Sequence, residues 1–157
     1  MPLLLADNNY LPFARAMVFA AKKRIYISTF KAEMSRKAVG KELLDFFTLI
    51  KSKARAGVTV KLLINWHANR RCVPRTNLMV SQDLKNSGVL VRHLAHNRCC
   101  HAKLLIADGV KAIVGSHNLS VRSVKDNFEL SILLDDSASL AKLCSVFEYS
   151  FQEAVRL

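Results

Sequence analysis

Helix-like and strand-like segments alternate along the first two thirds of this chain, and this alternation limits its fold more than any other feature. Apolar residues recur at helical spacing over residues 9–23 and 39–57, and the second segment ends at Gly57, a typical helix terminator. Short apolar runs typical of strands follow at 24–30, 58–65 and 89–94. Because strands that alternate with helices pack as a sheet covered by helices, the pattern indicates an α/β fold.

Several strands follow one another in the later part of the chain. The runs 101–107 and 110–115 are separated by Asp108-Gly109, a pair typical of tight hairpin turns, and a further strand is expected at 128–136. The prediction is a single domain, residues 1–157, built as a mixed β-sheet sandwiched between helices. The remaining expected elements are a loop at 66–76, a short helix at 77–87 and a C-terminal helix at 137–155.

The chain is strongly basic. Its 157 residues include 24 Lys and Arg against 12 Asp and Glu, which gives a formal net charge of +12. A charge of this size favours polyanionic partners such as nucleic acid or an anionic membrane surface. The amino terminus has no basic segment before an apolar run, and no stretch approaches about 18 uninterrupted apolar residues, so we expect a soluble, cytoplasmic protein.

The cysteines do not suggest a metal site. Cys72, Cys99, Cys100 and Cys144 show no C-x-x-C spacing, and neighbouring Cys99 and Cys100 are poor disulfide partners, so reduced thiols are expected. The sequence also lacks a cluster of acidic residues suited to Mg²⁺, so we expect chemistry without a metal or another cofactor. Whether Cys99 and Cys100 make a site at the adjacent His101 sensitive to oxidation is left open.

Polar residues gather in the strand-like runs of the second half. His101 and Lys103 are two residues apart, and so are Ser116 and Asn118, so each pair shares one face of an extended chain. Neighbouring strands would bring the two pairs to one edge of the sheet. Histidine, lysine, serine and asparagine gathered at one edge indicate a functional site rather than a packing solution.

A third pair, Asn127 and Glu129, has the same spacing. Its apolar neighbours Phe128, Leu130 and Ile132 are expected to face the core behind it. A glutamate at this edge can accept the second imidazole N–H of a catalytic histidine, which fixes the tautomer and stabilises the cation.

Phosphoryl transfer is the chemistry that this set suits. His101 can act as a nucleophile or general acid near neutral pH. Lys103 and Asn118 can hold the non-bridging phosphate oxygens, where charge grows in the transition state. Asp108, at the hairpin turn, is expected to be structural.

These residues form a specific pattern, in which H-x-K-x4-D is followed by G-S-x-N. The first motif consists of His101, Lys103 and Asp108, and the second of Gly115, Ser116 and Asn118. The combination resembles the signature of the phospholipase D superfamily, in which Glu129 occupies the position of a carboxylate kept for the histidine. The resemblance implies a two-step reaction. One histidine attacks the phosphodiester to form a phosphohistidine, a second histidine from another motif copy protonates the leaving oxygen, and water completes hydrolysis.

Only one copy of the motif is present in this sequence. The small single-motif members that the chain resembles build their site across a two-fold dimer. The resemblance therefore implies a homodimer in which His101 meets its symmetry mate as general acid.

The family resemblance leaves the substrate open, because its members act on DNA or RNA, on phospholipid head groups, or in phosphatidyl transfer. The charge of +12 and the resemblance to small nucleases favour an endonuclease on DNA or RNA. The alternatives are a phospholipase D-type hydrolase or phosphatidyl transferase on anionic phospholipid, and a catalytically silent nucleic-acid-binding module.

The basic loop is the candidate for substrate binding. Trp66 could stack a base while nearby cationic side chains guide a phosphate backbone, although a solvated loop with a half-buried tryptophan is an equal alternative. His117, inside G-S-H-N, is expected to point away from Ser116 and Asn118 and to take no direct part. The other candidate residues of the loop are His67, Arg70, Arg71 and Arg75.

Overall fold

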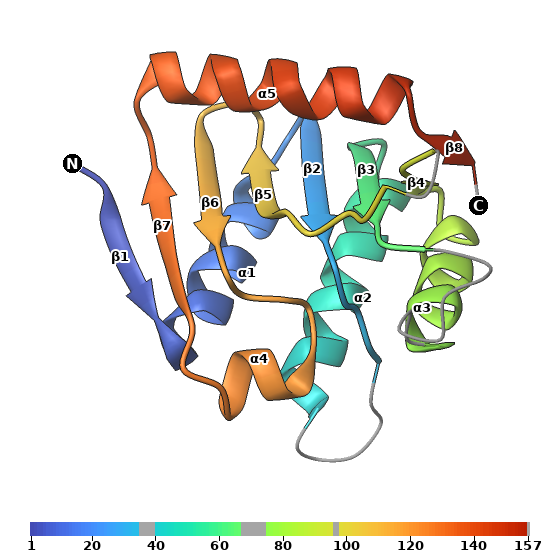
Figure 1. The fold of residues 1–157 in the computed structure, drawn as a ribbon, viewed down its shortest axis with the longest axis horizontal. Coiled ribbons are helices and arrows are strands. Elements are labelled where there is room, and N and C mark those ends of the chain that lie inside the picture. Colours follow the sequence, from blue (N-terminus) through green and yellow to red (C-terminus); the bar gives the residue numbers. More distant parts are fainter. Residues whose placement is uncertain (35–39, 67–74, 96–97, 157) are drawn as a thin grey trace.

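Eight strands form one continuous mixed sheet in the computed structural model, which describes residues 1–34, 40–66, 75–95 and 98–156. Across the sheet the strand order is β1-β7-β6-β5-β2-β3-β4-β8 (Figure 1), which confirms the expected mixed sheet. The strands are β1 (Leu3–Ala6), β2 (Arg24–Thr29), β3 (Thr59–Ile64), β4 (Leu90–His93), β5 (Lys103–Ala107), β6 (Lys111–Gly115), β7 (Leu130–Leu134) and β8 (Val155–Arg156).

The strand directions bring several strand ends to one edge of the sheet. β2, β3 and β4 are parallel, whereas β5 runs antiparallel to β2, β6 to β5 and β7 to β6. In this register Ser28 of β2 lies opposite Leu104, and Lys103 lies opposite Gly115. The carboxyl ends of β2, β3, β4 and β6 therefore meet the amino ends of β5 and β7. We call this edge, with His101, Lys103 and the Ser116–Asn118 segment, the polar edge.

Helices cover both faces of the sheet. On one face lie α1 (Tyr10–Ala20), α2 (Lys41–Arg55), α3 (Arg75–Lys85) and the short α4 (Val121–Lys125), and α1 follows a single 3-10 turn, η1 (Asp7–Asn9). On the other face lies α5 (Ser137–Gln152), which crosses the molecule beside the sheet (Figure 1).

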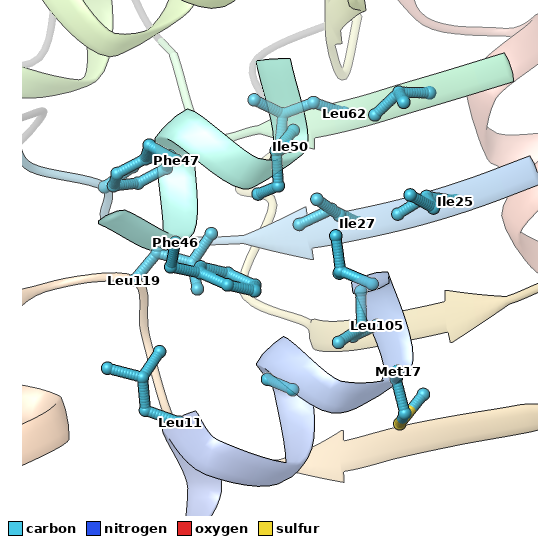
Figure 2. Packing of buried hydrophobic residues seen from close by; sticks show 14 of the residues in the cluster. Leu11, Met17, Ile25, Ile27, Phe46, Phe47, Ile50, Leu62, Leu105 and Leu119 are labelled. Atoms are coloured by element: carbon cyan, nitrogen blue, oxygen red, sulfur yellow. The ribbon is translucent and has the colours of Figure 1, made fainter. Parts of the chain in front are cut away.

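The larger core lies between the sheet and the helices of the first face (Figure 2). Phe46, Phe47 and Ile50 of α2 are at most 1% exposed, because apolar residues spaced three or four apart share one face of a helix. A smaller core lies under α5, where the Phe147 ring stacks on Tyr26 with centroids 4.8 Å apart. The two cores fix the sheet between rigid layers and so hold the strand ends of the polar edge.

The hairpin turn between β5 and β6 forms as the Asp108-Gly109 pair predicts. Both residues have positive φ, 54° and 73°, the combination of a type I′ turn. The Asp108 carboxylate accepts backbone N–H bonds of 2.8 Å from Lys22, Lys23 and Arg24. Burial raises the pKa of this carboxyl, but the three N–H groups outweigh burial and hold the pKa below its usual range. Asp108 thus ties the turn to the start of β2, at the opposite end of β5 from His101.

Some elements differ from the sequence expectations. The strands β1 and β8 and the helix α4 were not expected, and α3 begins at Arg75, inside the segment expected as a loop. His101 and Glu129 precede β5 and β7 instead of lying within them. β1 escaped prediction because its four residues are stabilised by pairing with β7, more than 120 residues later in the chain.

The expectation that Phe128, Leu130 and Ile132 face the core is wrong. These side chains are 80%, 41% and 43% exposed, whereas Ser131 and Leu133, which point to the other face, are buried. The alternation is present, but the face is the opposite one. α5 packs on β6, β5, β2 and β3 and leaves the same face of β7 and β1 uncovered among the described residues.

Candidate active site

His101 and Lys103 lie against each other at the polar edge. The Lys103 Nζ is 3.1 Å from His101 Nδ1, 3.2 Å from Nε2 and 2.6 Å from the His101 carbonyl oxygen. Because an ammonium group can only donate, an imidazole nitrogen that faces it must carry the lone pair. A histidine in this form can attack an electrophilic phosphorus.

Phe30, the residue after β2, packs against both side chains. Its ring centroid is 5.1 Å from that of His101, and the Lys103 Nζ lies 5.6 Å from it. Burial lowers the pKa of Lys103 below its ordinary value, although the carboxylate of Glu129 raises it. Since its ammonium has already lost part of its water, it can bind phosphate oxygens at a smaller desolvation cost. Phe30 could not be predicted as a site residue, because an aromatic residue at the end of a buried strand usually belongs to the core.

Glu129 is held by three hydrogen-bond donors. Ser116 Oγ donates to its Oε2, and Ser123 Oγ and Asn127 Nδ2 donate to its Oε1 at 2.8 and 3.1 Å. Burial raises the pKa of Glu129, but the bonds from Ser116, Asn127 and Ser123 outweigh burial and hold the pKa below its usual range. Glu129 is therefore a carboxylate at neutral pH, and it fixes the Ser116 hydroxyl at the polar edge.

No hydrogen bond joins Glu129 to His101 in the part of the chain that the structure describes. The negative charge of Glu129 acts on Lys103 instead. The role predicted for Glu129, to accept an imidazole N–H, stays a prediction.

Asn118 is bound through its amide oxygen to the segment that follows β2. Its Oδ1 accepts the backbone N–H of Lys31 at 3.1 Å and lies 3.4 Å from the Thr29 hydroxyl. Because a backbone N–H can only donate, this contact fixes which amide atom is the oxygen. Within residues 1–34, 40–66, 75–95 and 98–156, the Asn118 Nδ2 has no protein acceptor and remains a donor for a ligand.

Ser123 links the two halves of this arrangement. Its Oγ accepts the backbone N–H of Asn118 at 2.7 Å and donates to Glu129 at 2.8 Å. The hydroxyl is buried at 1% exposure, so both bonds are shielded from water. Ser123 could not be predicted as a site residue, because a serine in a short helix gives no signal until its tertiary neighbours are known.

Gly115 is required by a close approach of β6 to β7. A Cβ at this position would lie 2.2 Å from Ser131 Oγ and 2.4 Å from the Leu130 carbonyl oxygen. Any other residue would push the strands apart just before Ser116 and Asn118. The glycine of G-S-x-N therefore permits the close strand packing that positions the backbone of Ser116 and Asn118.

A cavity of about 540 Å³ opens beside the histidine and lysine. His101, Lys103 and Ser116 form part of its polar wall, and Leu143 and Val146 of α5 are part of its apolar wall. A second hollow of about 460 Å³ shares Val114, Leu143 and Val146 with it and extends over Ile132. The polar edge thus borders an apolar surface on the α5 side of the sheet.

His117 points away from Ser116 and Asn118, as the alternation predicted. It is 1% exposed, its Nδ1 lies 2.7 Å from Ser131 Oγ, and its ring stacks on Tyr10 with centroids 4.5 Å apart. Burial lowers the pKa of His117, so the imidazole is neutral at neutral pH. His117 ties the turn to the amino-terminal segment and does not line the cavity.

The basic loop is only partly described. Trp66 is half-buried just after β3, and Arg75 is exposed at the first position of α3. His67, Arg70 and Arg71 lie outside the described residues, as does Cys72. The substrate-binding role of this loop stays a prediction.

Cys99 and Cys100 differ in environment. Cys99 is exposed and lines the cavity beside His101, whereas Cys100 is buried with its thiol 3.2 Å from Ser28 Oγ. Burial raises the pKa of the Cys100 thiol, so it stays protonated at neutral pH.

The described residues contain neither a metal-binding cluster nor a membrane-spanning helix. No group of three or more His, Cys, Asp or Glu side chains is placed there to hold a metal ion. No helix there combines the length and apolar character needed to cross a membrane.

The chain is similar in sequence to proteins of one family. The family model for the cardiolipin synthase PLD-like domain matches residues 15–152. The chain belongs to the phospholipase D-like family. This phospholipase D-like chain is 28% identical to cardiolipin synthase 2 of Bacillus cereus over 141 residues, which cover 88% of this chain and 25% of that one. It thus spans about a quarter of the length of the curated relatives it matches.

Two solved structures share the fold over the whole chain. Nuc, a phospholipase D family member from Salmonella typhimurium, matches with a TM-score of 0.80 at 16% identity and covers 100% of this chain and 99% of that one. NucT from Helicobacter pylori matches with a TM-score of 0.77 at 20% identity and the same coverage. At these identities the structural matches establish the fold of this phospholipase D-like chain.

Proposed function

We propose that this phospholipase D-like chain is a phosphodiesterase that cleaves DNA or RNA as an endonuclease. The observation that carries the proposal is the contact between His101 and Lys103 at the same sheet edge as Asn118, whose Nδ2 has no acceptor among the described residues. A nucleophile, a cation and a neutral donor are the groups needed to attack a phosphodiester and to hold its oxygens.

In the first step His101 forms a bond from an imidazole nitrogen to phosphorus, and the bond from phosphorus to the leaving oxygen breaks. Lys103 and Asn118 hold the non-bridging oxygens, where negative charge accumulates. The leaving alkoxide takes a proton from a second histidine. In the second step water attacks the phosphohistidine, gives its proton back to that histidine, and releases a phosphomonoester and free His101. Because these residues supply every step, we expect the reaction to proceed in excess EDTA.

The second histidine is the partner subunit's His101 in our proposal. The sequence contains one H-x-K-x4-D motif, and His117, the histidine inside G-S-H-N, is buried and turned away. Two copies related by a two-fold axis would place two such histidines in one composite site.

The apolar surface beside the polar edge supports a dimer of this kind. Leu4 of β1, Leu130 and Ile132 of β7, and Val146 of α5 are exposed on the α5 side of the sheet. This surface is continuous with the cavity that His101 lines, through the shared residue Val146. A partner seated there would bury apolar area next to the catalytic residues, so burial and site assembly would occur together.

Nucleic acid is favoured as substrate by charge. A net charge of +12 on 157 residues favours a polyphosphate backbone, because bound cations release its counterions. Arg98 lines the cavity beside the polar edge and adds to its positive potential, whereas the Lys31 ammonium is paired with Glu33 at 3.1 Å.

A second candidate is a phospholipase D-type hydrolase or phosphatidyl transferase acting on anionic phospholipid. The match to the cardiolipin synthase PLD-like domain over residues 15–152 favours it. The same nucleophile and phosphate-binding groups would serve that reaction, with a lipid alcohol as leaving group or acceptor. A silent nucleic-acid-binding module remains the third outcome of the test below.

The test is cleavage of labelled single- and double-stranded DNA and RNA in excess EDTA, with an anionic phospholipid as a parallel substrate. We expect nucleic-acid cleavage by the native chain and a loss of at least about 1,000-fold in His101→Ala. Turnover of lipid alone would instead support the second candidate, a phospholipase D-type hydrolase or phosphatidyl transferase. Binding of nucleic acid without turnover, unchanged in His101→Ala, would overturn the enzyme proposal.

Mixed dimers test the composite site. If each site needs both histidines, an equal mixture of native and His101→Ala chains after subunit exchange should retain about one quarter of the native activity. Independent sites would retain about one half. The second result would refute the shared site while leaving the phosphodiesterase proposal intact.

A further inference from the structure

Asn77 of α3 lies beneath the polar edge and is completely buried, with 0% exposure. Its side chain makes three hydrogen bonds, all to backbone atoms of the segments that follow β2 and β3. The Oδ1 accepts the N–H of Ala32 at 2.8 Å, and the Nδ2 donates to the carbonyl oxygens of Phe30 at 2.9 Å and Asn65 at 2.8 Å. Three of the four hydrogen bonds that an asparagine amide can make are therefore used on two strand ends.

One branch of this network leads to His101. Asn65 follows β3, and its Oδ1 accepts the backbone N–H of Cys100 at 3.0 Å. Cys100 is the residue directly before His101 and is itself 3% exposed, so this bond fixes the backbone from which the nucleophile extends. Asn77 holds Asn65, and Asn65 holds the residue before His101.

A second branch leads to Asn118. Asn77 clamps Phe30 and Ala32, the two neighbours of Lys31. The Lys31 N–H is the donor that orients the Asn118 amide, and Ala32 forms a parallel bridge with Leu119. The same clamp also fixes the backbone of Phe30, whose ring packs against His101.

We infer that Asn77 is a positioning residue of the active site, which sets the separation between the His101 nucleophile and the Asn118 phosphate donor. The inference deepens the proposed function and rests on it, because both residues must contact one phosphate group. Among the described residues, no hydrogen bond joins Asn77 to His101 or to Asn118. Asn77 acts by holding the ends of β2 and β3 at a fixed distance, and each strand end carries one of the two branches.

The buried position explains why this residue is an amide. The carbonyl oxygens of Phe30 and Asn65 and the N–H of Ala32 lie beyond the strand ends, where the sheet provides them with no partner. Burying these three backbone groups without hydrogen bonds would cost free energy. An apolar side chain could fill the space but could not hold the two strand ends together. A short amide supplies one acceptor and two donors at a single point.

The test compares Asn77→Asp and Asn77→Ala with Leu84→Ala. Asn77→Asp keeps the acceptor for Ala32 and loses both donors, while Asn77→Ala loses all three bonds. Leu84 lies on the same helix at 1% exposure and makes no contact with the strand ends through hydrogen bonds, so Leu84→Ala controls for general loss of α3 packing. The substrate is bis(p-nitrophenyl) phosphate, and all chains are assayed at a temperature where circular dichroism shows them folded.

For both Asn77 variants we expect kcat to fall about 10- to 100-fold, with KM within about twofold, because a misplacement of about 1 Å has effects of this size. Leu84→Ala should keep the native kcat when folded. In amide NMR spectra of labelled protein, the signals of Cys100, Lys31 and the Asn118 side chain should shift in the Asn77 variants and stay in place in Leu84→Ala. A native kcat in a folded Asn77 variant, or an equal loss in Leu84→Ala, would overturn the inference.

A second pair of variants covers the case in which the Asn77 variants do not fold. Asn65→Asp retains an oxygen to accept the Cys100 N–H, whereas Asn65→Ala removes it. We expect Asn65→Ala to lower kcat and shift the Cys100 signal, and Asn65→Asp to restore both. Equal kcat in the two Asn65 variants would count against the branch to His101. If the native chain shows no turnover at all, the proposed function fails, and the NMR shifts alone decide whether Asn77 positions the two segments.

Discussion

Replacing Asp108 should destabilise the protein without damaging its chemistry. The carboxylate accepts three backbone N–H bonds of 2.8 Å, and the residue sits at φ 54° at the end of β5 away from His101. A hydrogen bond to a charged group contributes about 1.5–3 kcal/mol when buried, but water can reach this half-buried turn, so about 1 kcal/mol for each bond is the appropriate scale. An alanine at positive φ adds strain of about 1 kcal/mol.

We therefore expect Asp108→Ala to lower the free energy of unfolding by about 3–5 kcal/mol at pH 7. Asp108→Asn should lose only about 1–2 kcal/mol, because asparagine tolerates positive φ and keeps one acceptor oxygen. Urea unfolding followed by circular dichroism measures both values. At a temperature where Asp108→Asn is folded, its phosphodiesterase activity should equal that of the native chain.

The pH dependence gives a second check on the same bonds. The folded-state pKa of Asp108 lies below its usual value, so the unfolded chain binds the proton more readily in the interval between the two. The contribution of Asp108 is complete above about pH 4 and is lost as the pH falls through the folded pKa. The difference between native and Asp108→Asn stability should accordingly shrink in acid. A loss below about 1 kcal/mol in Asp108→Ala, or an Asp108→Asn chain that is folded and inactive, would refute the assignment of Asp108 to structure.

Three further predictions follow from the same geometry. Gly115→Ala should lower the free energy of unfolding, measured with urea, by about 2–4 kcal/mol, because a Cβ there has no room. The control Gly57→Ala, at φ 88° with open space around it, should lower it by about 1 kcal/mol. Equal losses would show that β6 and β7 can separate freely. Burial lowers the pKa of His117 in the folded state, so the free energy of unfolding should fall as the pH drops below about 6.5. His117→Gln should reduce this pH dependence, and a pH dependence equal to that of the native chain would contradict the prediction. Ile132→Glu should yield inactive monomers by analytical ultracentrifugation. The control Val110→Glu, which changes another exposed apolar residue at the β5–β6 turn, should stay dimeric and active. Dimers in both variants would show that the interface does not include Ile132.

The sequence predicted the central sheet because its signals there are local. β2, β3, β5 and β6 are continuous apolar runs between clear helix and turn residues, and the Asp108-Gly109 turn forms as expected. The mixed sheet with helices on both faces is confirmed for the same reason. β1 and β8 are short edge strands that exist only through long-range pairing, and nothing in their own residues distinguishes them from loops.

The choice of face on β7 shows the limit of pattern reasoning. Alternation separates Leu130 and Ile132 from Ser131 and Leu133, but it does not say which set meets a helix. The apolar set was expected inside on hydrophobicity alone. It lies outside because α5 packs on β6, β5, β2 and β3 and leaves these side chains exposed, and the exposed set becomes the surface for which we propose a second copy.

The motif residues of the site could be chosen from sequence because their types and spacing are unusual. Phe30, Ser123 and Asn77 could not, since each is an ordinary residue whose role comes from neighbours distant in sequence. An asparagine near the start of a helix is ordinarily taken as a cap. Here the side chain is turned inward, and only the tertiary structure shows that it bonds to two strand ends.

The spacing of H-x-K-x4-D has a physical origin in this fold. Lys103 is the first residue of β5 and Asp108 directly follows its last, so the motif spans one strand with a polar group at each end. Asp108 binds the start of β2, while the end of β2 leads into Phe30, which packs against His101. A slip of β5 by one residue against β2 would turn Lys103 to the opposite face of the sheet. The aspartate therefore pins the register of the strand that presents the histidine and lysine, and a motif with one residue more or fewer between lysine and aspartate could not satisfy both ends at once.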